Sequence, residues 1–190
     1  MKYPVLSQLE ILFHFQKYLK SWNIPVVTVG NKVDGIKYIG VDNYSAMKSL
    51  SQYVISCKPA NIIYFSPIFN DNKQNFYAQK ERFRGFKDSV CGEDIDWHVV
   101  NDEKILLSHI KSGTAIIAST DVYALKILFS GIAGECLVAG FDNIPSIQKY
   151  HIPLISVDSN KQKHAEAVVN YLINPHKDSD EFFSYQIIGI

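Results

Sequence analysis

The sequence predicts an α/β fold in which parallel strands are flanked by helices. Short β-branched and apolar runs alternate with stretches of helical periodicity along the chain. The segments between successive strands are too long for hairpin turns, so helical crossovers are expected to join the strands in parallel. With 190 residues, of which 47% are hydrophobic and 20% are charged, the chain has the size and composition to bury a core of its own.

The first third of the chain is expected to contain two helices and two strands. Residues 7–10 form a capping box, and the apolar spacing that follows predicts a helix as far as residue 22. The β-branched run 25–29 predicts a strand, and so does the run 38–41. Asp42 then provides an N-cap side chain for a second helix, which is expected to end near residue 57.

The middle third is expected to alternate three strands with two helices. Apolar runs predict strands at 61–65, 97–100 and 114–118. Helical spacing predicts a helix over 76–90 and a shorter one over 104–110.

The last third continues the same alternation. A helix is expected over 121–129, strands over 136–141 and 154–157, and a helix over 161–173. Residues 182–190 resemble one further strand. Parallel sheets bind ligands outside the carboxyl ends of their strands, so the residues that follow each strand are the candidates for a site.

Charge and cysteine content limit the classes of function. Nineteen basic residues balance nineteen acidic ones, which gives no electrostatic argument for nucleic acid binding by this polypeptide alone. The three cysteines (57, 91 and 136) are too few and too widely spaced for a disulfide framework or a zinc site. No apolar run has the length of a membrane span or a signal peptide, so a cytoplasmic protein without a membrane partner is expected.

Motifs for catalysis, cofactors and metals are absent from the sequence. No phosphate-binding loop or GxGxxG follows a predicted strand, and there is no GxSxG nucleophile elbow. The six histidines form no HxH or HExxH pair, and the carboxylate clusters at 93–96 and 178–181 lie in predicted loops. The sequence therefore predicts a protein that is not an enzyme and needs no cofactor or metal.

Arg82 is the first candidate for a binding residue. The chain has 17 lysines and only two arginines, both within Glu81-Arg-Phe-Arg-Gly-Phe86. A sequence that otherwise uses lysine can retain arginine where a planar, bidentate donor is needed. The alternatives are a solvated helix residue or a structural ion pair with a nearby carboxylate.

Two other candidates follow predicted strands. Thr120 and Asp121 open a helix directly after the run 114–118, and either residue can simply be its N-cap. Asp142 follows the run 136–141 and can accept hydrogen bonds from a polyhydroxyl ligand, or it can only organise the turn before Pro145.

Six short segments follow one another in order along the chain: Pro25-Val-Val27, Val41-Asp-Asn43, Arg82-Phe-Arg-Gly-Phe86, Ala118 to Leu125, Val138 to Pro145, and Pro153 to Val157. Each segment is a weak signal by itself. Their order and spacing together resemble the effector-binding core of the lactose/galactose-repressor (LacI/GalR) family of transcriptional regulators. The resemblance covers nearly the whole chain.

This resemblance implies a periplasmic-binding-protein-like fold of type I. Such a protein has two α/β lobes with parallel sheets and holds a sugar or a similar small effector in the cleft. Family members form homodimers through this core and read operator DNA through a separate amino-terminal helix-turn-helix.

The resemblance also suggests which residues contact the effector. Arg82 matches the arginine that binds effector hydroxyls, Thr120 matches a polar contact, and Asp142 matches the carboxylate that closes on the ligand. Asp121 falls in the same segment, where capping is expected more than contact. Ser159 lies near the crossover that usually adds a further polar contact.

The chain also departs from the family pattern. It is expected to be an amino-terminally truncated core that lacks the helix-turn-helix and about half of the first lobe. Residues 1–41 and 159–190 would be the remnant of that lobe, and residues 42–158 would form a complete second lobe. An incomplete lobe exposes a sheet edge, which favours a dimer, and DNA would be reached only through the missing headpiece.

Two expected pocket features are missing as well. Gly30 stands where many relatives have an aspartate or an asparagine that faces the effector. Asn101 and Asp102 follow the strand at 97–100 without the aromatic residue that usually stacks on a sugar. The leading prediction is the effector-sensing domain of a DNA-binding repressor. A transport-type sugar-binding protein and a degenerate fragment that binds nothing are the alternatives.

Overall fold

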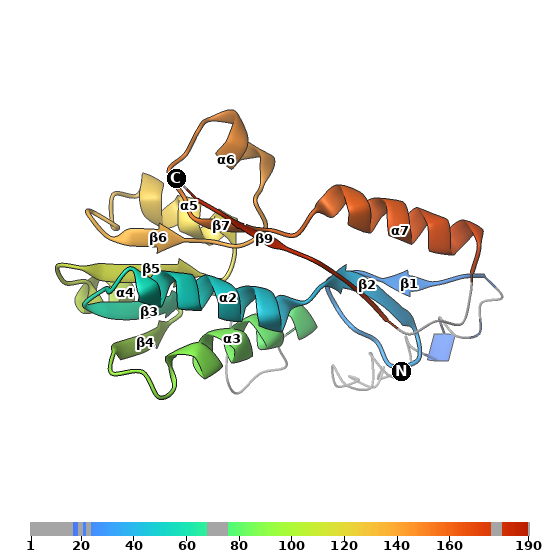
Figure 1. The fold of residues 1–190 in the computed structure, drawn as a ribbon, viewed down its shortest axis with the longest axis horizontal. Helices are drawn as coiled ribbons and strands as arrows, with labels where there is room; N and C mark the ends of the chain where they lie inside the picture. The colour runs from blue at the N-terminus through green and yellow to red at the C-terminus, as the bar shows by residue number, and fades with distance from the viewer. Residues whose placement is uncertain (1–16, 19–20, 22–23, 68–75, 176–179, 190) are drawn as a thin grey trace, which may run out of the picture. The chain divides into compact units, whose positions relative to one another are not determined.

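The structure is a computed structural model that describes residues 17–18, 21, 24–67, 76–175 and 180–189 (Figure 1). It divides the chain into two compact units. The first unit comprises Met1–Gly40 and Gln162–Phe182, and the second comprises Val41–Lys161 and Phe183–Ile190. The sequence division placed residues 159–190 together, whereas here the last eight residues belong to the second unit, where they contribute a strand.

The second unit is built on a four-stranded parallel sheet with the strand order β4-β3-β5-β6. Its strands are β3 (Asn61–Phe65), β4 (Asp96–Val100), β5 (Thr114–Ala118) and β6 (Leu137–Ala139). Phe65 pairs in register with Val100 on one side and with Ala118 on the other, so three strands end at the same level. The carboxyl ends of these strands therefore form one edge, and the residues that follow them lie side by side there.

Helices cover both faces of this sheet. On one face, α2 (Asn43–Ser56) and α3 (Tyr77–Val90) enclose an apolar cluster with β3 and β5. On the other face, α4 (Glu103–His109) and α5 (Asp121–Phe129) enclose a second cluster. Every residue of β3 and β5 is buried, as expected for central strands of a sheet that is covered on both sides.

Local sequence explains where these helices begin. The Asp42 carboxylate accepts a hydrogen bond from Ser45 N at 3.0 Å and caps α2, as predicted. Asp102 caps α4 in the same way. The N-cap of α5 is Thr120, whose side chain makes no capping hydrogen bond, and Asp121 is the first residue of the helix.

The second unit also contains an antiparallel pair of strands. β7 (Ser156–Asp158) pairs with β9 (Gln186–Ile188), and Ile155 forms a parallel bridge to Ala139 of β6. The sequence predicted one strand over 182–190, but the structure breaks it into β8 (Glu181–Phe183) and β9, which belong to different sheets. The short helix α6 (Pro145–Lys149) was not predicted.

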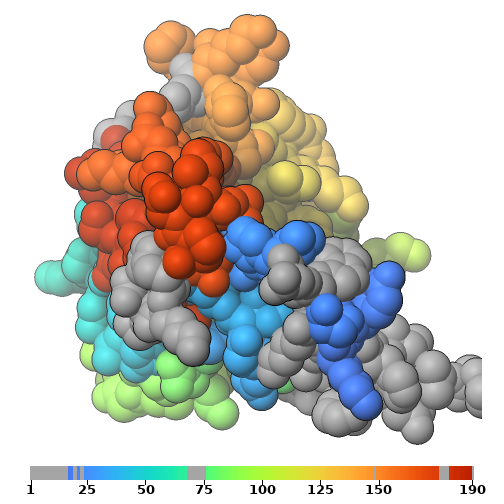
Figure 2. All heavy atoms as spheres, turned by 90° about the vertical axis from the view of Figure 1, so that its right-hand side faces the viewer, coloured from blue at the N-terminus to red at the C-terminus, as the bar shows by residue number. Residues whose placement is uncertain are grey.

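The first unit contains β1 (Val27–Thr28), β2 (Lys37–Val41), β8 and α7 (Lys161–Ile173). Its three strands form a sheet with the order β1-β2-β8. Asp180 fastens this sheet, because its carboxylate accepts a hydrogen bond from Tyr38 N at 2.9 Å and pairs with Lys32 Nζ. α7 lies at the surface of this unit, coloured orange-red in Figure 2. Most of the helix predicted over 7–22 lies outside the described residues.

The predicted fold class is confirmed, with parallel sheets flanked by helices. Among the described residues, no helix is long and apolar enough to cross a membrane.

Candidate functional site

The candidate site lies at the carboxyl edge of the sheet in the second unit, and its centre is Arg82 on α3. Gly85, one turn further along, brings α3 close to α2. A β-carbon at Gly85 would lie 2.3 Å from the Tyr44 carbonyl oxygen, so only glycine fits without a shift of one helix. Phe86, the next residue, packs α3 against the sheet, since its ring stacks on Tyr64 of β3 at 4.8 Å between centroids. These contacts place Arg82 at the end of the sheet.

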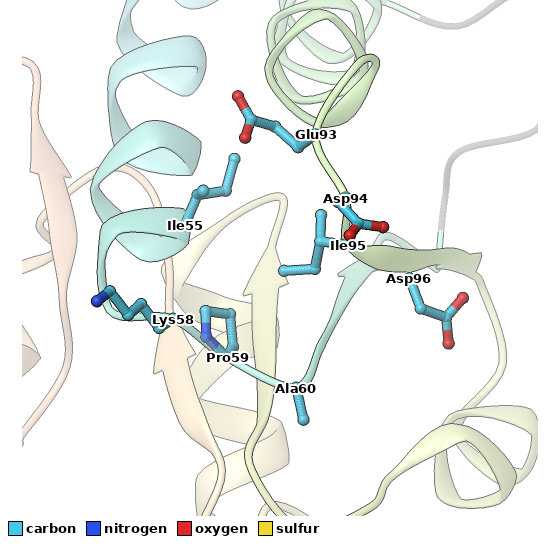
Figure 3. A pocket seen from close by; sticks show the side chains of 8 residues that line it. All are labelled: Ile55, Lys58, Pro59, Ala60, Glu93, Asp94, Ile95 and Asp96. Atoms are coloured by element: carbon cyan, nitrogen blue, oxygen red, sulfur yellow. The ribbon is translucent and has the colours of Figure 1, made fainter.

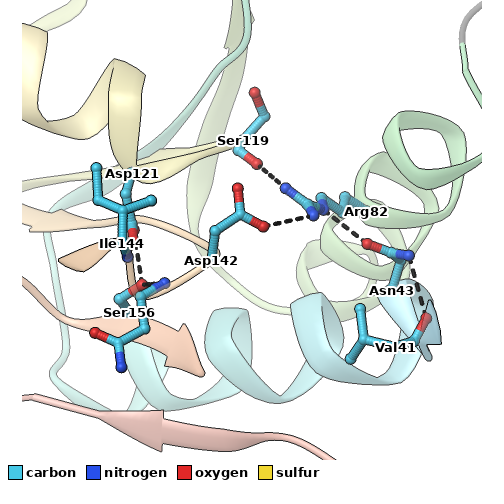
Figure 4. A network of polar contacts seen from close by, with 9 residues as sticks. Val41, Asn43, Arg82, Ser119, Asp121, Asp142, Ile144 and Ser156 are labelled. Atoms are coloured by element: carbon cyan, nitrogen blue, oxygen red, sulfur yellow. Dashed lines mark hydrogen bonds and ion pairs between the residues drawn. The ribbon is translucent and has the colours of Figure 1, made fainter. Parts of the chain in front are cut away.

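Three hydrogen bonds and one aromatic ring hold the Arg82 guanidinium (Figure 4). Nε donates to Asn43 Oδ1 at 2.8 Å, Nη1 donates to the Ser119 carbonyl at 2.8 Å, and Nη2 donates to Asp142 Oδ1 at 2.9 Å. The plane of the guanidinium lies over the Phe141 ring, with Cζ 3.7 Å from the centroid. The side chain is only 11% exposed, so this arginine is not a solvated helix residue. The other alternative, a structural ion pair with a nearby carboxylate, is present in the contact with Asp142.

Asn43 links Arg82 to the beginning of α2. Its side chain is buried, accepts from Arg82 Nε and donates from Nδ2 to the Val41 carbonyl at 3.2 Å. Asn43 was not among the predicted contacts, although its place directly after the strand at 38–41 was a usable signal.

Asp142 faces Arg82 from the loop after β6, and its backbone is strained. Its φ angle is +110°, and the next residue, Asn143, has a φ of +42°. Non-glycine residues rarely adopt such values, and they persist where the surroundings hold the backbone in place. Here Asp142 N donates to the Val157 carbonyl, and Asn143 N donates to Ser156 Oγ. Asp142 therefore takes part in the turn before Pro145 while its carboxylate faces Arg82. Its contact with a ligand stays a prediction.

Asp121 stabilises the same loop through two hydrogen bonds. It is fully buried, with Oδ1 accepting from Ser156 Oγ at 2.6 Å and Oδ2 accepting from Ile144 N at 3.0 Å. Burial raises the pKa of the Asp121 carboxyl, although these hydrogen bonds and the charge of Lys161 oppose the shift. Both oxygens are engaged within the protein, so this carboxylate positions the loop around Asp142.

The other two predicted residues stand apart from the Arg82 contacts. Thr120 is half-buried at the start of α5, next to Ser119. Ser159 is buried just beyond β7, and no described contact joins it to Arg82 or Asp142. The structure thus brings Arg82 and Asp142 together directly, Asp121 indirectly, and leaves Thr120 and Ser159 at the margin.

Two buried hydroxyls at this edge lack partners among the described residues. Ser66 follows β3 and Ser119 follows β5, and neither hydroxyl oxygen has a hydrogen bond. They are neighbours, because Ser119 N donates to the Phe65 carbonyl at 2.9 Å. Buried hydroxyls without partners are uncommon and cost free energy unless water or a ligand satisfies them. Their position after predicted strands was the only sequence signal.

Tyr64 is buried next to the site, and its phenol contributes no charge to it. It is fully buried, and desolvation raises the pKa of its phenol well above the usual range, although the nearby Arg82 charge lowers it somewhat. This group stays neutral at any physiological pH.

A separate pocket opens at the opposite edge of the sheet (Figure 3). It has a volume of about 290 Å³, and it is lined by Ile55, Lys58, Pro59, Ala60, Glu93, Asp94, Ile95 and Asp96. Ala60 precedes β3 and Asp96 begins β4, so this pocket lies at the amino ends of the strands, away from Arg82. Among the described residues, no group of three His, Cys, Asp or Glu side chains is placed to hold a metal ion.

Comparison with known proteins agrees with the fold. The sequence matches no protein-family model and no curated protein. A LacI transcriptional regulator from a Rhodococcus species superimposes over 98% of this chain and 74% of its own, with 15% identity and a TM-score of 0.77.

Two further similar structures contain sugars. A periplasmic solute-binding protein of an ABC transporter from Actinobacillus succinogenes, with bound D-allose, matches 96% of this chain and 75% of its own (17% identity, TM-score 0.75). A periplasmic binding protein/LacI transcriptional regulator from Alkaliphilus metalliredigens, complexed with D-xylulofuranose, matches 87% of this chain and 69% of its own (19% identity, TM-score 0.69).

The class defined by these findings is the periplasmic-binding-protein-like fold of type I. The similar structures are mostly LacI-family regulators, and those named here are regulators and binding proteins. The resemblance noted in the sequence is therefore confirmed at the level of the fold.

Proposed function

We propose that this chain is the effector-binding domain of a LacI-family transcriptional regulator that senses a sugar or a similar small metabolite. The observation that carries the proposal is the Arg82–Asp142 pair, which lies at the carboxyl edge of a parallel sheet, where such folds bind ligands. Two similar structures hold sugars, which supports a carbohydrate as the ligand class.

The pair has the chemistry that a hydroxyl group needs. Arg82 uses three of its N–H groups within the protein, which leaves the other two of its five donors for a ligand. Asp142 binds Arg82 through Oδ1 only, and its side chain is 26% exposed. A sugar hydroxyl both donates and accepts, so neighbouring hydroxyls can donate to Asp142 and accept from Arg82.

The other predicted residues take different places in this proposal. Thr120 and Ser159 stay proposed ligand contacts at the margin of the site. Asp121 acts as a positioning residue, because both of its oxygens are already bound within the protein.

Calorimetric titration with monosaccharides and disaccharides, including D-allose and D-xylulose, tests this proposal. At least one sugar is expected to bind, and Arg82→Lys is expected to weaken its binding by about tenfold or more, because a charged hydrogen-bonding partner contributes about 1.5–3 kcal/mol. Lys80→Ala is the matched control, since Lys80 is exposed on the same helix. Absence of binding across the panel, or equal effects of the two substitutions, contradicts the proposal.

A homodimer is the second part of the proposal. α4 and α5 are joined by an ion pair between Glu103 and Lys126, and large apolar side chains on both helices are exposed. The most exposed is Phe129, at 75%. Light scattering coupled to size-exclusion chromatography is expected to show a dimer, and Phe129→Asp is expected to shift it toward the monomer. A wild-type protein that stays monomeric at high concentration contradicts this part.

Two further parts of the proposal, regulation of transcription through DNA binding and a cytoplasmic location, depend on a helix-turn-helix headpiece that would be encoded next to this chain. A transport-type sugar-binding protein is the second candidate, because this chain is also similar in structure to the periplasmic solute-binding protein from Actinobacillus succinogenes, with a TM-score of 0.75. Sequencing the gene upstream separates the two candidates. A helix-turn-helix supports the regulator, and a secretion signal supports the transport protein.

A further inference from the structure

The charges at the carboxyl edge of the second unit restrict the ligand further than the proposed function does. Arg82 is the one cation among the described hydrogen-bonded contacts of this edge, and Asp142 already meets its charge at 2.9 Å. Two more carboxylates follow, since Asp121 accepts two hydrogen bonds and Asp158 accepts one from Asn143 at 3.1 Å.

Among the described residues, one further positive charge acts on this edge, and it is weak. Lys161 is close enough for its field to lower the pKa of Asp121, but its side chain is exposed, so solvent and salt screen it. Helix N-termini attract anions, but α2, α4 and α5 each begin with a carboxylate at the N-cap or in the first turn, whereas α3 begins without one. The first turn of α2 is capped by the Asp42 carboxylate, and α5 begins with the buried Asp121 carboxylate.

An anion that binds Arg82 would therefore have to displace Asp142 from the guanidinium or lie against the Asp142 carboxylate. Displacement is hindered, because the hydrogen bond from Asp142 N to the Val157 carbonyl and the neighbouring contacts of Asn143 hold the loop. A phosphate beside Asp142 would face a carboxylate at close range, and the repulsion between the two negative charges would weaken its binding. A neutral hydroxyl meets neither penalty.

We propose that this site selects an uncharged polyhydroxyl ligand and rejects phosphorylated sugars, with Asp142 as the residue that determines this selectivity. The proposal rests on the proposed function, since it names the chemical class of ligand for the same site. Asp142 has two effects here: it accepts hydroxyls through its free oxygen, and it neutralises the arginine that an anion would otherwise bind.

The experiment compares sugars with their phosphate esters by calorimetry on the purified chain. The pairs are D-allose and D-allose 6-phosphate, D-xylulose and D-xylulose 5-phosphate, and D-glucose and D-glucose 6-phosphate. In each pair that binds, the ester is expected to bind at least about tenfold more weakly than the free sugar. Inorganic phosphate up to millimolar concentration is expected to leave the melting temperature unchanged.

Asp142→Asn supplies the direct test of the residue. Asparagine tolerates a positive φ and keeps the shape of the side chain, so the loop is expected to fold, which circular dichroism checks. The ratio of ester affinity to sugar affinity is expected to rise by about tenfold or more in this variant. Asp94→Asn is the control, because it makes the same charge change in an exposed loop at the opposite edge of the sheet.

The outcomes distinguish this inference from the proposed function. An ester that binds the wild-type protein as tightly as its free sugar, or an affinity ratio that Asp142→Asn leaves unchanged, overturns the inference and leaves the sensing of sugars intact. A rise in melting temperature with inorganic phosphate also overturns it. If neither member of any pair binds, both the proposed function and this inference fail.

Discussion

Replacement of Asp121 by alanine tests whether the loop around Asp142 is held from within the protein. Asp121 is fully buried and accepts hydrogen bonds from Ser156 Oγ and Ile144 N. Each hydrogen bond to a charged group contributes about 1.5–3 kcal/mol, and the relief of a buried carboxylate offsets part of the total. We therefore expect Asp121→Ala to lower the free energy of unfolding by about 2–4 kcal/mol.

Urea denaturation followed by far-ultraviolet circular dichroism measures this loss. Asp94→Ala is the control, because its side chain is exposed and its effect is expected to stay within about 0.5 kcal/mol. A loss below about 1 kcal/mol in Asp121→Ala would refute the reasoning, since it would mean that the two hydrogen bonds contribute nothing beyond the cost of burying the charge.

Gly140 provides an internal check on the same contact. A β-carbon there would lie 2.3 Å from Asp121 Oδ1, so Gly140→Ala is expected to be strongly destabilising in the wild-type protein. Asp121→Ala removes that oxygen. In a double-mutant cycle, Gly140→Ala should therefore cost less in the Asp121→Ala background, and strictly additive losses would contradict the geometry.

Three other substitutions follow from the described contacts. Gly85→Ala would place a β-carbon 2.3 Å from a carbonyl oxygen of α2, so it should cost about 1–3 kcal/mol in urea unfolding and weaken sugar binding with it, whereas unchanged stability would exclude the close approach. The hydrogen bond from Lys32 holds the pKa of Asp180 below its usual range, so its contribution to stability is complete at neutral pH and is lost as pH falls through the folded-state pKa. Thermal melts over about pH 5 to 2 should therefore show less loss of stability in Asp180→Asn than in the wild-type protein, and parallel curves would contradict this. Asn43→Ala should weaken sugar binding by about three- to tenfold through loss of the hydrogen bond to Arg82 Nε, which calorimetry measures, and an unchanged affinity would contradict this.

Features governed by local sequence could be predicted well. The N-cap at Asp42 and the fully apolar runs of β3 and β5 need only neighbouring residues to be recognised, and the structure places these elements as expected. Arg82 was also identifiable, because arginine is rare in this chain and the family resemblance pointed to Arg82 rather than Arg84.

Features that depend on distant partners could not be predicted. The stretch 182–190 is uniformly strand-like, but its two halves pair with β2 and β7, and the sequence carries no sign of that division. The bonding of Asp121 to Ser156 joins residues 35 positions apart. The positive φ of Asp142 likewise comes from the loop's long-range contacts rather than from any turn motif.

The backbone of Asp142 limits how this position can change as the sequence drifts. A φ of +110° is a region that glycine occupies freely, while a residue with a side chain carries a conformational cost of about 1–3 kcal/mol. The substitution that most easily relieves this backbone is thus also one that removes the carboxylate opposite Arg82. A single base change converts an aspartate codon to a glycine codon. In a lineage that no longer used the ligand, this one change would remove the carboxylate that faces Arg82 and leave the fold intact.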